Sequence, residues 1–123
     1  MVIDKKHSRS RGPIVSLTRQ PCEGRARDGG LRVGEMERDC MLTHGASMFT
    51  KERLMDVSDP FETGICRGCG SLATMNDIDG LYECKTCNSK VGFERKTIPY
   101  AVKLWLQELE AMHISPRMIL GKE

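Results

Sequence analysis

The stretch CRGCGSLATMNDIDGLYECKTC, residues 66–87, holds four of the chain's six cysteines as two C-x2-C pairs separated by fourteen residues. Two residues between paired cysteines allow both thiolates to point at one ion, and structural zinc sites take four ligands, with sulfur at about 2.3 Å. Small or turn-forming residues accompany each pair: Gly68 and Gly70 at the first, Asn88 and Ser89 after the second. The spacing therefore predicts one structural Zn²⁺ ion. Its ligands are expected to be Cys66, Cys69, Cys84 and Cys87.

Two other chemistries fit the same cysteines less well. A thioredoxin-like redox site needs one C-x-x-C pair at the start of a helix within a βαβ unit, whereas both pairs here lie among strand-like runs. A catalytic zinc site keeps one coordination position open for water, and four cysteine ligands leave none. Cys22 and Cys40 have no partner at metal spacing, so we expect them to be thiols without a metal.

Short strand-like runs surround the cysteine pairs, with Gly, Asn and Asp residues between them. Asp77 and Asp79 occupy an expected hairpin turn, where such residues are common. The pattern predicts a small antiparallel sheet. Its strands are expected at residues 61–65, 72–75, 81–84 and 91–93.

A helix is predicted to follow the sheet. Proline is favoured at the first helical position, which Pro99 can occupy, and apolar residues then recur at helical spacing from Ala101 to Met112. Ser115 and Pro116 are expected to stop the helix.

A second helical part is predicted before the cysteines, over residues 35–55. Glu35 and Glu37 favour a helix start there, because negative charge complements the helix dipole, and Gly45 is expected to divide the segment in two. A turn at residues 57–61 then separates this part from the cysteine-rich part.

Residues 1–34 contain too many Gly and Pro residues for a helix, and only Ile14–Leu17 resembles a strand. The predicted fold class is therefore α+β, small and loop-rich. We expect three parts: an extended basic arm with a Gly-rich loop at 1–34, a helical part at 35–60, and a zinc ribbon with its helix at 61–123.

Positive charge is concentrated near the N-terminus. Residues 1–32 hold eight Lys or Arg residues against three acids, while the rest of the chain holds eleven against fourteen. Arginine can grip phosphate with two parallel hydrogen bonds, and glycine lets the backbone approach a polyanion closely. Nucleic-acid contact is one interpretation of this arm, and a merely solvated loop is the other. The candidate contacts are Lys5, His7, Arg9, Arg11, Arg19, Arg25, Arg27 and Arg32.

Several function classes are disfavoured. No run approaches the roughly 20 apolar residues needed to cross a bilayer, and the N-terminus lacks the apolar run of a signal peptide. We therefore expect an intracellular chain with no membrane association. Paired carboxylates, a Ser-His-Asp set and an acidic metal cluster are not recognisable, so no complete active site is expected.

At these residues the chain closely resembles the C-terminal end of the second-largest subunit of multisubunit DNA-directed RNA polymerases of the eukaryotic, archaeal and large-DNA-virus type. The resemblance covers residues 1–117 and includes the four cysteines. The matching stretches are DKKHSRSRGP (4–13), LTRQPCEGRARDGGLRVGEMERDC (17–40), KERLMDVSD (51–59) and IPYAVKLWLQELEAMHISPR (98–117).

The resemblance implies a role in DNA-templated RNA synthesis, a nucleotidyl transfer. Residues 1–31 would hold the RNA–DNA hybrid and the template, with the Gly-rich loop as a flexible switch. The helical part would be the subunit's anchor, and the zinc ribbon with the last helix would be its share of the clamp, packed against the largest subunit. The catalytic Mg²⁺ site is expected mainly on that largest subunit, because this chain has no matching aspartate triad.

The family subunit is far longer than this chain, so the resemblance also implies a fragment, a piece of a split gene or a truncated reading frame. The expected location is the nucleus for a cellular eukaryote, and the host cytoplasm, nucleus or virion for a virus. The alternative hypothesis is a free-standing zinc-ribbon protein that binds nucleic acid or acts as a transcription factor.

Overall fold

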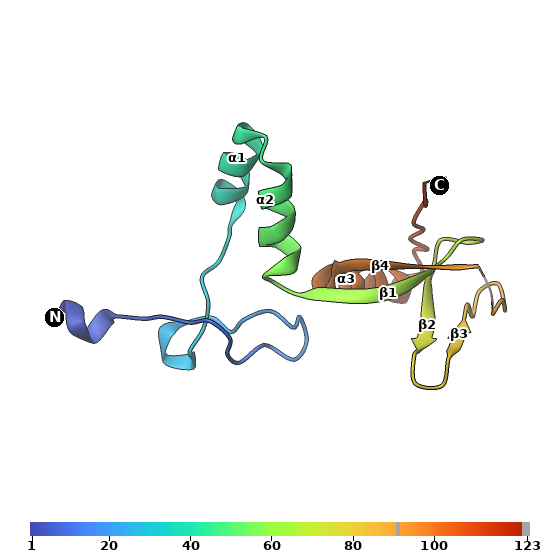
Figure 1. The fold of residues 1–123 in the computed structure, drawn as a ribbon, viewed down its shortest axis with the longest axis horizontal. Coiled ribbons are helices and arrows are strands. Elements are labelled where there is room, and N and C mark those ends of the chain that lie inside the picture. The colour runs from blue at the N-terminus through green and yellow to red at the C-terminus, as the bar shows by residue number, and fades with distance from the viewer. Residues whose placement is uncertain (91, 122–123) are drawn as a thin grey trace. The chain divides into compact units, whose positions relative to one another are not determined.

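The computed structural model describes residues 1–90 and 92–121, and it divides into two compact units, Met1–Asp59 and Pro60–Glu123 (Figure 1). Each unit has its own hydrogen-bonded framework. No helix within the described ranges is long and apolar enough to span a membrane.

The second unit is built on an antiparallel sheet, as the sequence predicts. In the described residues its strand order is β3-β2-β1-β4: β1, β2 and β3 pair in succession, and β4 returns to pair with the other edge of β1 (Figure 1). The β2–β3 turn holds Asp77 and Asp79, as expected, and the Asn76 side chain closes it by accepting hydrogen bonds from the backbone of Ile78 and Asp79. The strands are β1 (Pro60–Cys66), β2 (Leu72–Asn76), β3 (Leu81–Glu83) and β4 (Phe93–Pro99).

The last strand corrects one prediction. A short strand was expected at 91–93, but β4 runs from Phe93 to Pro99 and pairs with the whole of β1. Val91 lies outside the described residues. Residues 94–97 are polar and carry no apolar alternation, so the pattern hides the strand; charged side chains are common on edge strands because they discourage further pairing.

The core of the second unit is small. Ile65 is 1% exposed, and Phe93 packs beside the buried cysteines. The predicted helix is present as α3 (Tyr100–Ala111), with Pro99 as its N-cap and not its first helical residue, and it buries Leu106. Its first residue, Tyr100, packs edge-to-face on Phe61 of β1, with the ring centroids 5.3 Å apart.

The helices of the first unit follow the predicted division. Helix α1 (Glu35–His44) ends where Gly45 takes a left-handed conformation, φ +66°. Helix α2 (Ser47–Lys51) follows and continues into one turn of π-helix, Glu52–Asp56. The Glu37 carboxylate accepts a hydrogen bond from the Gly34 backbone N–H (2.9 Å) and so caps the start of α1.

The first 34 residues are mainly loops, with a single strand-like bridge where a strand was expected. Ile14 pairs only with Pro21, because the chain reverses at Arg19, which has φ +53°. The Val15 N–H donates to the Gln20 carbonyl (2.8 Å) and closes this reversal. The expected strand at Ile14–Leu17 is therefore wrong in extent.

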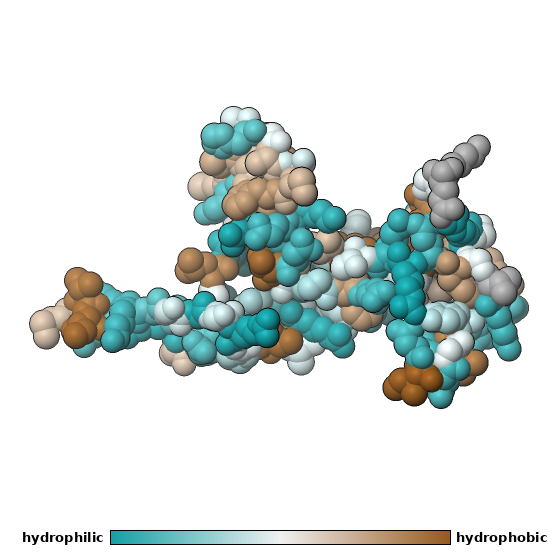
Figure 2. Space-filling view, viewed as in Figure 1, coloured by the Kyte–Doolittle hydropathy of each residue, from teal (hydrophilic) through white to brown (hydrophobic). Residues whose placement is uncertain are grey.

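Apolar side chains remain exposed on both units. Figure 2 shows apolar surface over the N-terminal turn, where Val2 is 87% exposed, and over the tip of the β2–β3 hairpin, where Ile78 is 95% exposed. Along α1 and α2, only Met41 is buried. Thin cores of this kind are typical of chains that bury more apolar surface in an assembly.

Replacing Ile65 by Ala should destabilise the second unit by about 2–4 kcal/mol, because it leaves a cavity in the best-buried position of the sheet. Denaturant unfolding of the full chain, followed by the fluorescence of its single tryptophan, Trp105, measures this. Ile78→Ala is the matched control. It should change the free energy of unfolding by less than about 0.5 kcal/mol, and equal effects of both substitutions would contradict this description of the core.

Candidate metal centre and candidate nucleic-acid interface

Each cysteine pair lies in a tight backbone turn, and the two turns are built in the same way. The N–H of the first cysteine donates to the carbonyl of the serine five residues later: Cys66 to Ser71 at 3.0 Å and Cys84 to Ser89 at 2.9 Å. The residue after the second cysteine has positive φ in both turns, +73° at Gly70 and +53° at Asn88. Gly and Asn tolerate this conformation, which explains why they occur there.

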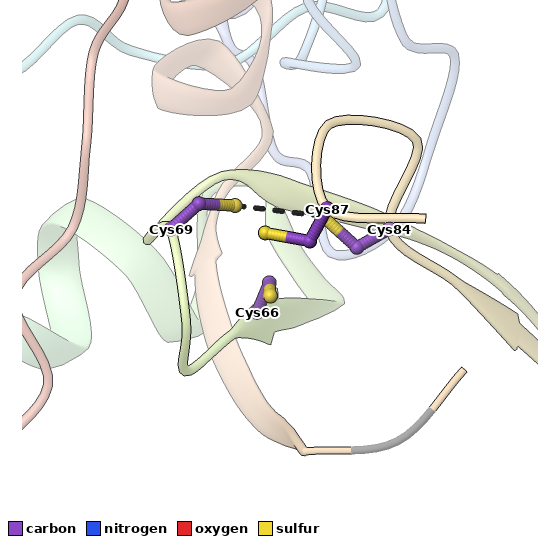
Figure 3. Close-up of side chains that lie close together, drawn as sticks. All are labelled: Cys66, Cys69, Cys84 and Cys87. Atoms are coloured by element: carbon purple, nitrogen blue, oxygen red, sulfur yellow. Dashed lines mark hydrogen bonds between the residues drawn. The ribbon is translucent and has the colours of Figure 1, made fainter. Parts of the chain in front are cut away.

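These turns bring four sulfur atoms together. The Sγ atoms of the predicted ligands all lie within 4.8 Å of one another, and those of Cys69 and Cys84 are 3.4 Å apart (Figure 3). In the described residues this is the one group of three or more Cys, His, Asp or Glu side chains arranged to hold a metal ion. Three of the cysteines are buried and Cys87 is exposed. The donor set is therefore able to bind one metal ion, and four thiolates are ligands that zinc prefers.

The local electrostatics favour the thiolate of Cys69 and disfavour those of Cys84 and Cys87. Hydrogen bonds from the Ser71 side chain and backbone lower the pKa of Cys69 to about 6. The hydrogen bond with Cys69 raises the pKa of Cys87 to about 12, and local desolvation beside the neighbouring thiols adds to this although the residue is exposed. Backbone hydrogen bonding from Cys87 acts to lower the pKa of Cys84, but burial and the neighbouring thiols outweigh it and raise the pKa overall. A cation at the centre would reverse this mutual penalty, because it stabilises all four thiolates at once.

The segment after α3 packs on the first cysteine turn. The Met118 N–H donates to the Gly70 carbonyl at 2.9 Å, and a Cβ added at Gly70 would lie 2.4 Å from the Met118 carbonyl oxygen. The positive φ and this close approach both require glycine at position 70.

The predicted nucleic-acid residues fall into two groups. His7 and Arg9 are bound to backbone carbonyl groups of the Gly-rich loop: the His7 Nε2–H donates to Gly29 (2.7 Å), and Arg9 Nη1 donates to Asp28 (2.6 Å) and Pro13 (3.0 Å). The other six are exposed and lie in the same unit. They are Lys5, Arg11, Arg19, Arg25, Arg27 and Arg32.

The Gly-rich loop is closed by backbone hydrogen bonds. Gly29 N–H donates to the Gly24 carbonyl and Gly30 N–H to the Cys22 carbonyl, both at 2.9 Å. Between them, residues Arg25–Arg27 form one 3-10 turn with no buried residue. The loop therefore presents the Arg25 and Arg27 side chains outward from a closed backbone ring.

Ser71 was not among the predicted site residues, although its hydrogen bonds hold the Cys69 thiolate. A signal was present in the sequence, because CRGCGS (66–71) and CKTCNS (84–89) share the spacing C-x2-C-x-S. Met118, which packs on Gly70, leaves no such signal.

Comparison with known proteins agrees with the family resemblance of the sequence, because two families of RNA polymerase Rpb2 domains match this chain. Residues 29–121 match the family described as RNA polymerase Rpb2, domain 7, and residues 1–27 match RNA polymerase Rpb2, domain 6. The chain is 56% identical over 119 residues to DNA-directed RNA polymerase II subunit 2 of Arabidopsis thaliana, covering 97% of the chain and 10% of that protein.

Two further relatives show the same pattern. DNA-directed RNA polymerase II subunit RPB2 of Encephalitozoon cuniculi is 57% identical over 118 residues, covering 96% of the chain and 10% of that protein. DNA-directed RNA polymerase III subunit RPC2 of Saccharomyces cerevisiae is 53% identical over 120 residues, covering 98% of the chain and 10% of that protein. The chain thus spans about a tenth of the length of the curated relatives it matches.

Replacing Gly70 by Ala should weaken zinc binding by about tenfold or more, because a Cβ is strained at this φ and meets the Met118 backbone. Chelator competition on the full chain measures the affinity. Gly68→Ala is the control in the same turn: its Cβ would lie 3.6 Å from Cys66 Sγ and 3.7 Å from Cys87 Sγ, which are ordinary contacts. We expect less than about a twofold effect there, and equal losses would disprove the role of Gly70.

Zinc binding should release protons. At pH 7.5 the Cys69 thiol, with a pKa of about 6, is already ionised, whereas Cys84 and Cys87 carry protons because their pKa values are raised. At least two protons should leave per zinc bound, so affinity should fall as the pH falls, and more steeply below the pKa of Cys69. Calorimetry in buffers of different ionisation enthalpy counts them. Cys87→Ser should lower the count by one and Cys40→Ser should not; release of fewer than two protons by the unaltered chain would refute this electrostatic description.

Proposed function

Because the chain belongs to the Rpb2 family of DNA-directed RNA polymerase subunits, we propose that it is a segment of the second-largest subunit and supports DNA-templated RNA synthesis. The main support for this proposal is that residues 1–27 match domain 6 and residues 29–121 match domain 7 of that family, in consecutive order. The assembled enzyme would be a nucleotidyltransferase, and this chain would contribute template handling without a complete active site.

The proposed contribution of residues 1–34 is to hold the RNA–DNA hybrid and the template by their phosphates. Arg25 and Arg27 support this proposal, because they extend from an exposed turn whose ends are fixed by backbone hydrogen bonds. Lys5, Arg11, Arg19 and Arg32 would add charge along the same arm. Contacts of this kind neutralise phosphate without reading bases, so binding would be independent of sequence and would weaken with salt.

We propose that the four-cysteine centre holds one structural Zn²⁺ ion. Two features support this assignment. The four sulfur donors lie within 4.8 Å of one another, and four cysteine ligands leave no coordination position on zinc for water. When bound, zinc would supply a crosslink between the two cysteine turns and no reaction chemistry. The catalytic Mg²⁺ would be held mainly by the largest subunit, and no residue of this chain is assigned to it.

The parts of the chain would have different partners. Residues 1–34 would face the template and the hybrid, residues 35–60 would form the anchor, and residues 61–123 would form a clamp module docked on the largest subunit, with the other polymerase subunits completing the assembly. The named relatives are RNA polymerase II and III subunits of eukaryotes, so we propose a nuclear location. A viral source would instead place it in host cytoplasm, nucleus or virion.

The alternative, a free-standing zinc-ribbon nucleic-acid-binding protein or transcription factor, is not favoured. The similarity is not confined to the cysteine-rich part; it extends over the basic arm, which matches a different domain of the same subunit family.

Replacing Arg25 and Arg27 by Ala, in the polymerase assembled with this chain, should weaken template binding and reduce the slope of log affinity against log salt by about 0.9 for each lost phosphate contact. Salt titrations of DNA binding and elongation assays measure both effects. Arg38→Ala removes one equal charge from an exposed residue on α1 and should leave the slope unchanged. Unchanged template binding by the double variant would overturn the proposed role of the loop.

A further inference from the structure

Two alternate residues of the basic arm contact the Gly-rich loop, and both contacts go to its backbone. His7 Nε2 lies 2.7 Å from the Gly29 carbonyl oxygen, and Arg9 Nη1 lies 2.6 Å from the Asp28 carbonyl oxygen. A carbonyl accepts only, so the His7 proton must be on Nε2. Arg9 Nη1 also donates to the Pro13 carbonyl oxygen, 3.0 Å away. One nitrogen atom therefore binds both the segment that follows the arm and the Gly-rich loop.

The loop is shaped to offer these two carbonyls together. In an extended chain successive carbonyls point in opposite directions, but Asp28 has φ +52° and breaks that alternation. Gly29 is buried, and a Cβ there would lie 2.3 Å from the Cys22 carbonyl oxygen, so the backbone passes through a space that only glycine fits.

The arm also leaves room for the contact. A Cβ at Gly12 would lie 3.2 Å from Arg9 Cζ and 3.2 Å from an Asp28 carboxylate oxygen, so glycine at position 12 lets the guanidinium and the loop approach. Arg9 is only half-exposed, in contrast to the arginines at 11, 25 and 27.

Arg25 and Arg27 differ from Arg9, because their side chains do not take part in closing the loop. They are in the same closed loop, three and one residues before Asp28, yet neither side chain makes a hydrogen bond or ion pair with the described residues. Their guanidinium groups are available to a ligand, whereas the position of their backbone depends on what fixes the loop.

We propose that Arg9, assisted by His7, is a positioning residue that fastens the Gly-rich loop so that Arg25 and Arg27 are presented to phosphate. Arg9 acts through backbone carbonyls, and its effect on nucleic acid is indirect. The assignment of phosphate as the ligand of Arg25 and Arg27 depends on the function proposed above. The fastening of the loop depends only on the hydrogen bonds of Arg9 and His7.

The fastening is tested by hydrogen exchange of the complete chain in the complex with which it purifies. Arg9→Ala should make the amides of residues 22–30 exchange about tenfold faster, since a charge-assisted hydrogen bond of ordinary strength is lost. Arg11→Ala removes the same charge two residues away, from a side chain without a hydrogen bond or ion pair to the described residues, and should leave the exchange unchanged. Equal exchange in Arg9→Ala and the parent chain would overturn the proposal. If Arg9→Ala fails to assemble, His7→Ala gives the same readout.

A double-mutant cycle separates an indirect from a direct role of Arg9. If Arg9 acts through the loop, adding Arg9→Ala to the Arg25→Ala/Arg27→Ala variant should lower template affinity by less than about twofold further, although Arg9→Ala alone lowers it by about tenfold. Losses that multiply would show that Arg9 contacts phosphate itself and would overturn the proposal. If Arg25→Ala/Arg27→Ala binds template normally, the proposed function fails, and the exchange result alone then supports or overturns the fastening.

Discussion

The convergence of four thiols on one small volume is the constraint on which the second unit depends. Cys66 ends β1 and Cys84 follows β3, so the sulfur cluster joins the ends of strands that are not neighbours in the sheet. Apart from these cysteines, the apolar core that the structure describes in this unit contains little more than Ile65, Leu106 and the partly buried Phe93. So few apolar side chains bury little surface, and small domains commonly compensate with a metal or a crosslink. The raised pKa values of Cys84 and Cys87 also indicate a need for a cation, because neighbouring thiols disfavour the thiolate forms of these two cysteines when no metal is bound.

In both units, loops are held by backbone hydrogen bonds and positive-φ residues, with few buried apolar side chains. Each cysteine turn combines one positive-φ residue with one hydrogen bond across five residues, and the Gly-rich loop uses the same elements, with Asp28 in the left-handed region and two carbonyls closing the ring. Residues in such conformations are stable only when their surroundings determine them strongly. In the loop, that determination comes from Gly29 packed against Cys22 and from the side chains of His7 and Arg9. A loop closed in this conformation suits the proposed task, because it fixes where the Arg25 and Arg27 side chains begin.

The exposed apolar surface fits a chain that belongs to a family of large assembly subunits. Trp105 on α3 is 58% exposed and Ile78 is 95% exposed, whereas several polar side chains on the strands pair with their neighbours. Arg95, for example, pairs with Glu62 and Asp77 and donates a hydrogen bond to the Tyr82 hydroxyl group. Such ion pairs contribute little stability each when they are exposed. They connect the β2–β3 hairpin to β4, while the apolar side chains Ile78 and Trp105 of the same unit stay exposed.

The sequence by itself determined the elements whose signals are local: the two cysteine pairs with their Gly and Asn turns, the helix after Pro99, the break at Gly45 and the antiparallel sheet. It also carried the family resemblance, because long stretches of sequence preserve it. Tertiary structure alone decided the extent of β4, since a polar edge strand is stabilised by pairing with β1 and not by its own pattern. It likewise decided that only Ile14 of the expected strand Ile14–Leu17 forms a bridge, and that Arg9 and His7 bind the loop. Those contacts depend on carbonyl groups some twenty residues away, and every residue carries a carbonyl, so no side-chain pattern could reveal them.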